Sequence, residues 1–141
     1  MIAMSSMSRV LIVDDDSALL QALPDAITFR FPGTVVETTS SGIIALDMAQ
    51  TTDYEAIVVD LKMSGLNGLE VIARLQILRP GTPTLLVTAH GDRDIAIKAL
   101  RNGAYAFIEK PIDRDFFMAS LERAMQHHRL LRQVQEKGAV S

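Results

Sequence analysis

The feature that most constrains the fold is a set of short apolar segments that recur along the chain, several of them ending in a polar or charged residue. Residues 10–13 (VLIV) and 57–59 (IVV) are apolar and mostly β-branched, which is typical of strands buried on both faces of a parallel sheet. Asp14 follows the first run directly and Asp60 follows the second. Because ligands bind at the carboxyl edge of open α/β sheets, the sequence predicts a functional site there, centred on Asp60.

These apolar segments alternate with segments of helical periodicity. The predicted strands cover residues 10–13, 34–39, 57–60, 84–88 and 106–109. Since crossovers between parallel strands are right-handed and place helices on both faces, this alternation predicts a three-layer α/β fold with five parallel strands. The strand at 34–39 (TVVETT) is more polar than the others, which favours an edge position.

Each helical segment is preceded by a residue suited to begin a helix. These candidates are Asp16 or Ser17, Ser40 or Ser41, Asn67, Asp92 and Asp113. Pro24 lies within the first predicted helix and should kink it, because proline removes one backbone hydrogen bond. Gly103 is placed to end the fourth helix.

Length and composition limit the classes of protein to consider. A chain of 141 residues, 48% of them apolar, suits one domain. No cysteine is present, which excludes disulfides and thiolate chemistry. No apolar run approaches the roughly 20 residues of a membrane span, and the start lacks a signal-peptide pattern, so we expect a cytoplasmic protein without membrane contact. A net charge of -3 predicts no direct contact with nucleic acid.

The expected organisation is a loose lead at residues 1–8, a domain at 9–130 and a helical extension at 131–141. The last helix should run from Asp113 to Gly138, about 24 residues or roughly 36 Å. Five residues within it follow a spacing of four then three and would lie on one face of the helix: Phe117, Leu121, Ala124, His128 and Leu131. This spacing would let the part beyond the sheet pair with another helix. The alternative is a solvated tail whose basic residues suit the helix dipole.

Three carboxylates, Asp14, Asp15 and Asp60, are expected to meet at the carboxyl edge. Together they would repel one another unless a cation lay among them, and Mg²⁺ fits because it prefers carboxylates, water and phosphate oxygens. Lys110 adds a positive charge after the last predicted strand, and Thr88 adds a hydroxyl at the end of the fourth predicted strand. This combination indicates a site for a phosphoryl group.

Asp60 is the best candidate for a nucleophile that takes up the phosphoryl group as a mixed anhydride. It stands alone at its strand end, whereas Asp14 and Asp15 are a neighbouring pair suited to metal binding. Each residue also has an ordinary structural interpretation, such as a helix cap or a solvent-exposed lysine. The joint occurrence of these residues at four strand ends favours the functional interpretation.

Four motifs carry a family resemblance: VLIVDDD, VVDLKMSGLNGLE, LLVTAHGD and YAFIEKP. Over about residues 9–130, the order and spacing of these motifs resemble the receiver domain of bacterial two-component response regulators. The resemblance implies a flavodoxin-like (βα)5 fold with strand order 2-1-3-4-5.

For Asp60, the resemblance implies that its carboxylate accepts a phosphoryl group from a sensor histidine kinase or a phosphotransfer protein. Magnesium would be held by Asp14, Asp15, Asp60 and the backbone carbonyl of Lys62. The chain would promote its own phosphorylation and dephosphorylation, and would not turn over a separate substrate as an enzyme does.

Other implied roles concern the surroundings of the phosphoryl group. Thr88, Ala89 and Lys110 would contact it, and Ala89 is small enough to let it enter. Phe107 matches the aromatic residue whose rotamer follows the threonine. The peptide bond between Lys110 and Pro111 is expected to be cis.

Lys62 and His90 occupy the variable positions that tend to set the lifetime of the phosphoryl group. Phosphorylation is expected to change the face formed by the helix after Asp92, the last strand and the helix after Asp113. That face, or the C-terminal helix, would bind an output domain or a second copy of the chain.

Two other classes of function are open at this stage. Asp14-Asp15-Asp16 after a strand also resembles the D-x-D of haloacid-dehalogenase-type phosphohydrolases, with Asp14 as nucleophile and Asp16 as general acid. The other alternative is a docking module that keeps the fold without being phosphorylated.

Overall fold

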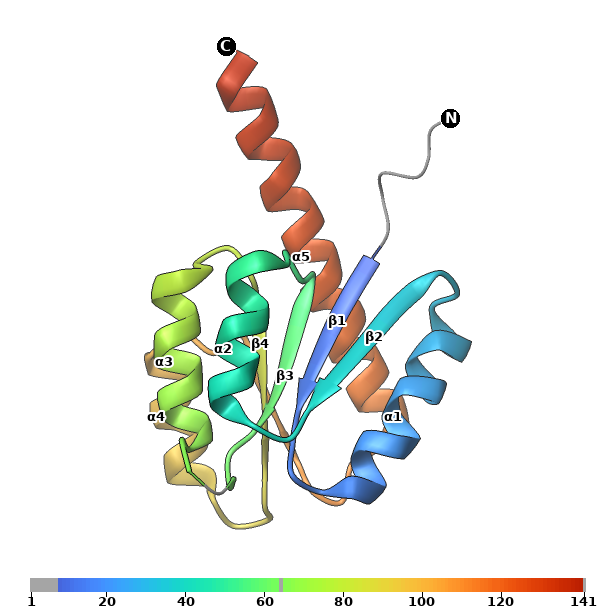
Figure 1. The fold of residues 1–141 in the computed structure, drawn as a ribbon, viewed down its shortest axis with the longest axis vertical. Coiled ribbons are helices and arrows are strands. Elements are labelled where there is room, and N and C mark those ends of the chain that lie inside the picture. The colour runs from blue at the N-terminus through green and yellow to red at the C-terminus, as the bar shows by residue number, and fades with distance from the viewer. Residues whose placement is uncertain (1–7, 64, 141) are drawn as a thin grey trace.

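The computed structural model describes residues 8–63 and 65–140, and the side chains up to residue 136. The predicted lead lies mostly outside the described residues, and Ser8 already belongs to the first strand. Strands and helices alternate along the whole described chain (Figure 1). The strands are β1 (Ser8–Val13), β2 (Thr34–Thr39), β3 (Ala56–Asp60), β4 (Thr84–Thr88) and β5 (Ala106–Glu109). The helices are α1 (Ser17–Arg30), α2 (Gly42–Thr51), α3 (Gly68–Leu78), α4 (Arg93–Arg101) and α5 (Arg114–Val140).

The five strands form one parallel sheet in the order β2-β1-β3-β4-β5. This confirms the predicted α/β fold, the order implied by the family resemblance and the edge position of the polar strand β2. The register pairs Asp60 with Val87 and Thr88 with Glu109. The polar ends of β3, β4 and β5 therefore lie on the same edge of the sheet.

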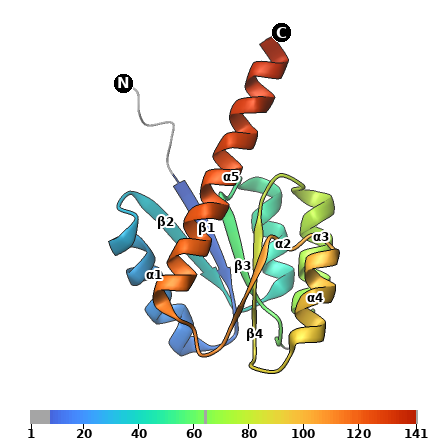
Figure 2. The same cartoon turned by 180° about the vertical axis from the view of Figure 1, so that it is seen from behind.

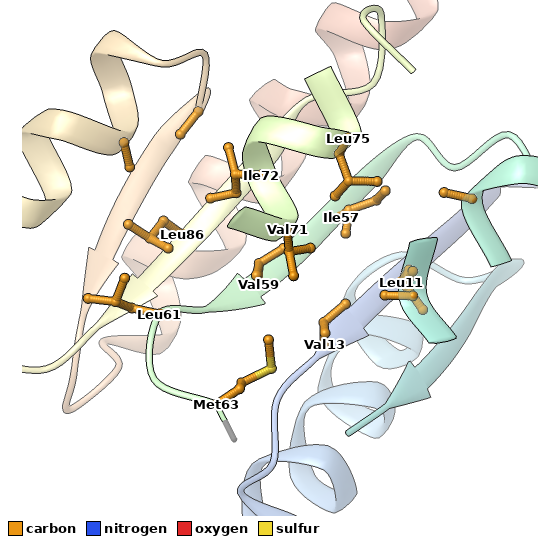
Figure 3. Close-up of a cluster of buried hydrophobic side chains, with 14 of the residues drawn as sticks. Leu11, Val13, Ile57, Val59, Leu61, Met63, Val71, Ile72, Leu75 and Leu86 are labelled. Atoms are coloured by element: carbon orange, nitrogen blue, oxygen red, sulfur yellow. The ribbon is translucent and has the colours of Figure 1, made fainter. Parts of the chain in front are cut away.

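Helices cover both faces of the sheet (Figures 1 and 2). On one face, side chains of α2, α3 and α4 pack against alternate residues of the strands, including Leu11, Val59 and Leu86. Figure 3 shows Val71 and Leu75 of α3 pointing into this core. On the other face, α1 and α5 cover the intervening strand residues. Burial on both faces explains why β1, β3 and β4 read as continuous apolar runs.

Four of the five helices begin at a side-chain cap. The carboxylate or hydroxyl oxygen of Asp16, Ser41 and Asp113 and the amide oxygen of Asn67 accept hydrogen bonds from backbone N–H groups in the first turn. Asp92 precedes α4 as predicted, but its side chain makes no such bond. Pro24 lies inside α1, and the helix continues through it to Arg30.

The 27 residues of α5 extend well beyond the sheet (Figure 2). The predicted pairing face is wrong in the N-terminal part of α5, because Phe117, Leu121, Ala124 and His128 are buried against the domain itself. The spacing of four then three arises because α5 packs on its own sheet. The helix also continues past Gly138.

Three basic residues of α5, His128, Arg129 and Arg132, bind the loop between α2 and β3, so these three are not part of a free solvated tail. His128 Nε2 lies 3.2 Å from Asp53 Oδ1, and Arg132 forms an ion pair with the same carboxylate. Arg129 donates two hydrogen bonds of 3.0 Å to Glu55. We call these five residues the α5 clamp. It holds the helix to the sheet at the end remote from Asp60.

Among the described residues, no helix is both long enough and apolar enough to cross a membrane.

Candidate functional site

Asp60 is the last residue of β3, and its side chain is 7% exposed. The backbone holds this strand end on two sides. Leu61 N donates to Val87 O of β4 at 2.8 Å, and Gly68 N donates to Leu61 O at 3.0 Å. A Cβ atom on Gly68 would lie 2.5 Å from Asp60 O and 2.7 Å from Leu61 Cα. Glycine is therefore required at position 68 for α3 to begin against the candidate acceptor.

The three predicted acids lie together. Asp14, Asp15 and Asp60 each offer an oxygen, and these oxygens lie within 4.8 Å of one another. Asp14 is buried with its Oδ1 accepting a 2.9 Å hydrogen bond from Asp16 N, whereas Asp15 is exposed at the rim. The cluster is thus open to solvent on one side, as a site that keeps water ligands on Mg²⁺ needs to be.

Lys110 supplies the positive charge beside the two buried acids. Its Nζ lies 3.6 Å from Asp60 Oδ2 and 3.9 Å from Asp14 Oδ2. The preceding strand places it there, since Lys110 N donates to Thr88 O at 2.7 Å. One ammonium group faces two buried carboxylates, so negative charge exceeds positive charge inside the cluster.

Burial raises the pKa of the Asp14 carboxyl to about 6. The hydrogen bond from Asp16 N lowers this pKa, the charge of Asp60 raises it and the charge of Lys110 lowers it. Desolvation disfavours the charged form of a carboxyl group, and a neighbouring carboxylate acts in the same direction. A cation bound beside Asp14 would therefore stabilise the ionised form of its carboxyl group.

Three buried oxygens at this edge have no hydrogen-bond partner among the described residues. They are Asp14 Oδ2, Thr88 Oγ1 and, beside Lys62, Asp92 Oδ2. Buried polar atoms are normally paired, so orphaned oxygens such as those of Asp14 and Thr88 are typical of a place that receives a ligand. The oxygens of the acid cluster suit a hard cation, and the Thr88 hydroxyl and the Lys110 ammonium suit phosphate oxygens. The residues present thus fit both Mg²⁺ and a phosphoryl group.

The variable positions beside the cluster have partners that the sequence did not indicate. The exposed Lys62 places its Nζ 3.7 Å from Asp92 Oδ2, and His90 Nδ1 lies 4.0 Å from Glu109 Oε2. Both contacts join residues of different loops or strands. These contacts arise from the three-dimensional fold and have no local sequence signal, because neither pair has a short sequence spacing.

The remaining predicted residues lie near the same edge. Ala89 follows Thr88 at the end of β4 and is partly exposed. Phe107 is partly buried and packs against the core formed with α2, α3 and α4. The peptide bond between Lys110 and Pro111 is cis, as the resemblance implies.

Asp16 does not join the acid cluster. Its carboxylate caps α1 by accepting from Ala18 N and Leu19 N, at 3.0 and 3.4 Å. This is the ordinary structural role for an acid after a strand. The structure therefore uses the candidate general acid of the hydrolase alternative as a helix cap.

Comparisons with known proteins agree on one family. The model of the response regulator receiver domain matches residues 10–122. The C4-dicarboxylate transport transcriptional regulatory protein DctD of Pseudomonas aeruginosa is 38% identical over 125 residues, which is 88% of this chain and 26% of that protein. The chain thus spans about a quarter of the length of this relative.

Solved structures show the same fold. A response regulator receiver domain protein from Methanospirillum hungatei has a TM-score of 0.81 at 26% identity, covering 88% of this chain and 98% of that one. An adenylate cyclase structure from Rhodopirellula baltica has a TM-score of 0.87 at 29% identity, covering 95% and 98%. With the fold, the acid cluster and the family model in agreement, the chain belongs to the receiver domains of two-component response regulators.

Proposed function

We propose that the domain accepts a phosphoryl group on Asp60 from a sensor histidine kinase or a phosphotransfer protein. The observation that carries this proposal is the pair of unpartnered buried oxygens, Asp14 Oδ2 and Thr88 Oγ1, on either side of a carboxylate held beside Lys110. A carboxylate oxygen of Asp60 forms the new bond to phosphorus. The bond between phosphorus and the donor's imidazole nitrogen breaks, and its electron pair returns to that nitrogen.

Magnesium would be held by Asp14, Asp15, Asp60 and the carbonyl oxygen of Lys62, where it would neutralise charge on the entering phosphoryl oxygens. The side chains of this chain do the rest. Lys110 pairs with a phosphoryl oxygen and keeps it oriented, and the Thr88 hydroxyl donates to another. Hydrolysis of the acyl phosphate returns the domain to its starting state, so phosphorylation and dephosphorylation occur on the chain itself.

Phosphorylation would act as a switch through Thr88. When its hydroxyl moves toward the phosphoryl group, it vacates space that the ring of Phe107 can fill, and the surface of α4, β5 and α5 changes. Apolar side chains are already exposed on or beside these elements: Ile97 and Leu100 in α4, Tyr105 immediately before β5, and Phe116 in α5. An exposed apolar surface of this kind supports a role in binding a partner.

Beyond the sheet, α5 exposes 60% of Leu130 and 65% of Val134. Four residues apart, they share one face of the helix and could pair with an output domain or a second copy of the chain. This face differs from the one that the sequence pattern indicated. We place the domain in the cytoplasm with protein partners, and without direct contact to nucleic acid or membrane.

The test is the mass of the intact protein after incubation with Mg²⁺ and acetyl phosphate. Wild type should gain one phosphoryl group of about 80 Da, and Asp60→Asn should gain none. Asp25→Asn, which removes an exposed acid of α1, is the matched control and should be labelled like wild type. Equal labelling of Asp60→Asn and wild type would refute the assignment. No labelling of any folded variant would favour a docking module.

A further inference from the structure

The start of α4 differs from the starts of the other four helices. Asp92 occupies the N-cap position, where aspartate normally accepts a hydrogen bond from the second or third N–H of the helix. Here φ is -87° and ψ is 39°, and the carboxylate makes no capping bond. The backbone N–H groups of Asp94 and Ile95 therefore lack the side-chain acceptor that the sequence provides for them.

The carboxylate of Asp92 faces Lys62 instead. Lys62 Nζ lies 3.7 Å from Asp92 Oδ2, and this oxygen is buried without a hydrogen-bond partner among the described residues. The Lys62 side chain is 73% exposed. An exposed ammonium group two residues after Asp60 is free to turn elsewhere, whereas the oxygen that it leaves behind would need a new partner.

Among the described helices, α4 is the shortest, and its anchors are small. It is nine residues long, and the residues that it buries are Ala96 and Ala99. A buried alanine contributes far less apolar area than the leucine and isoleucine side chains that anchor α3. The state of its N-cap therefore matters more for α4 than for α3.

We propose that Lys62 and Asp92 form a switchable ion pair that withholds the N-cap of α4 until the neighbouring acid is phosphorylated. This inference rests on the proposed function of Asp60. A phosphoryl group on Asp60 offers Lys62 a stronger anionic partner, and the Lys62 ammonium turns to it. The released carboxylate of Asp92 then accepts from the N–H of Asp94 or Ile95 and caps α4. Lys62 and Asp92 are thus positioning residues that connect the phosphorylation site with the first turn of α4.

Hydrogen exchange of the unphosphorylated protein tests the competition between ion pair and cap. Lys62→Gln frees Asp92, and Asp92→Asn gives a side chain that can cap but has no charge for Lys62. Both variants should raise the protection of the Asp94 and Ile95 amides by about two- to fivefold, as expected for a partly exposed ion pair. Asp92→Ala has neither pair nor cap and should show no rise.

A matched control is Asp94→Asn, which removes an acid from the same turn but leaves the Lys62–Asp92 pair in place. It should leave the protection of the Ile95 amide unchanged. The same protection in wild type, Lys62→Gln and Asp92→Asn would overturn the proposal. An equal rise in Asp92→Ala would also overturn it, because that variant has no side chain with which to cap.

Binding of beryllofluoride, a phosphoryl analogue, with Mg²⁺ tests the connection to the phosphorylation site. Removing the charge of Asp92 frees Lys62 for the analogue, so Asp92→Asn should bind it about two- to fivefold more tightly than wild type. In a Lys62→Gln background, the Asp92→Asn change should have no further effect. A gain of the same size in that background would overturn the connection.

Failure of this inference and failure of the proposed function can be told apart. If wild type takes up no phosphoryl group, the proposed function fails, and exchange in the unphosphorylated protein still decides whether the pair competes with the cap. If wild type is labelled on Asp60 and the exchange pattern is absent, the proposed function stands and the ion-pair switch is wrong.

Discussion

Replacing Asp14 by asparagine should make the metal-free domain more stable. Burial is the main reason that the pKa of Asp14 is raised, from an ordinary value of 3.8 to about 6. Its side chain is 2% exposed, so solvent screens this effect little. A shift of about two pH units at about 1.4 kcal/mol each corresponds to roughly 3 kcal/mol of destabilisation when the group is ionised. Asparagine keeps the shape of the side chain and removes the charge.

The sign of the pH dependence follows from which state binds the proton more tightly. Between pH 3.8 and about 6, the folded domain holds a proton on Asp14 that the unfolded chain has lost. Stability from this group therefore falls as pH rises through that window, and the penalty is complete above it. The advantage of Asp14→Asn should be near zero at pH 4 and about 3 kcal/mol at pH 7.5, or on the order of 10 °C in Tm.

The assay is urea unfolding of wild type and Asp14→Asn in the presence of a chelator, repeated from pH 4 to pH 7.5. Asp15→Asn is the control, because Asp15 is exposed and should change stability little. Adding Mg²⁺ should stabilise wild type by mass action and stabilise Asp14→Asn less. An Asp14→Asn variant no more stable than wild type at pH 7.5, or one whose advantage grows toward pH 4, would refute the reasoning.

Two further substitutions test the packing of the domain, one at the end of the sheet remote from Asp60 and one beside Asp60. Tyr54→Phe should destabilise the domain by about 1–2 kcal/mol in urea unfolding, because the buried hydroxyl donates to the Glu37 carboxylate; unchanged stability would contradict this. Gly68→Ala should cost about 1–3 kcal/mol and slow labelling by acetyl phosphate, because its Cβ would meet the backbone of Asp60 and Leu61. Gly81→Ala, where the nearest atom lies 4.0 Å away, is the control and should be neutral; equal losses in the two glycine variants would show that the close approach is unimportant.

The strands and the edge at which they end could be predicted from sequence because they depend on local patterns. β4 and β5 have the predicted bounds, and β3 ends at Asp60 as expected. Parallel pairing then brings Asp60 and Lys110 to one edge without further information. The cluster of Asp14 with these residues follows from the same rule.

Features that depend on distant partners could not be predicted. Helical spacing showed which face of α5 is apolar, but not that its own sheet covers Phe117 and Leu121. Asp92 has the local pattern of an N-cap, and the competing partner Lys62 lies 30 positions earlier in the chain. The close approach of Gly68 to Asp60 likewise depends on how α3 enters against β3.

The α5 clamp fixes the orientation of the part of α5 that extends beyond the sheet. His128, Arg129 and Arg132 hold the helix to Asp53 and Glu55, immediately before β3 begins. β3 itself is five residues long, roughly 16 Å, and ends at Asp60. The acid cluster therefore lies at one end of β3, and α5 extends beyond the sheet at the other end (Figure 1). The orientation of a domain joined to α5 would therefore depend on the strand that carries Asp60.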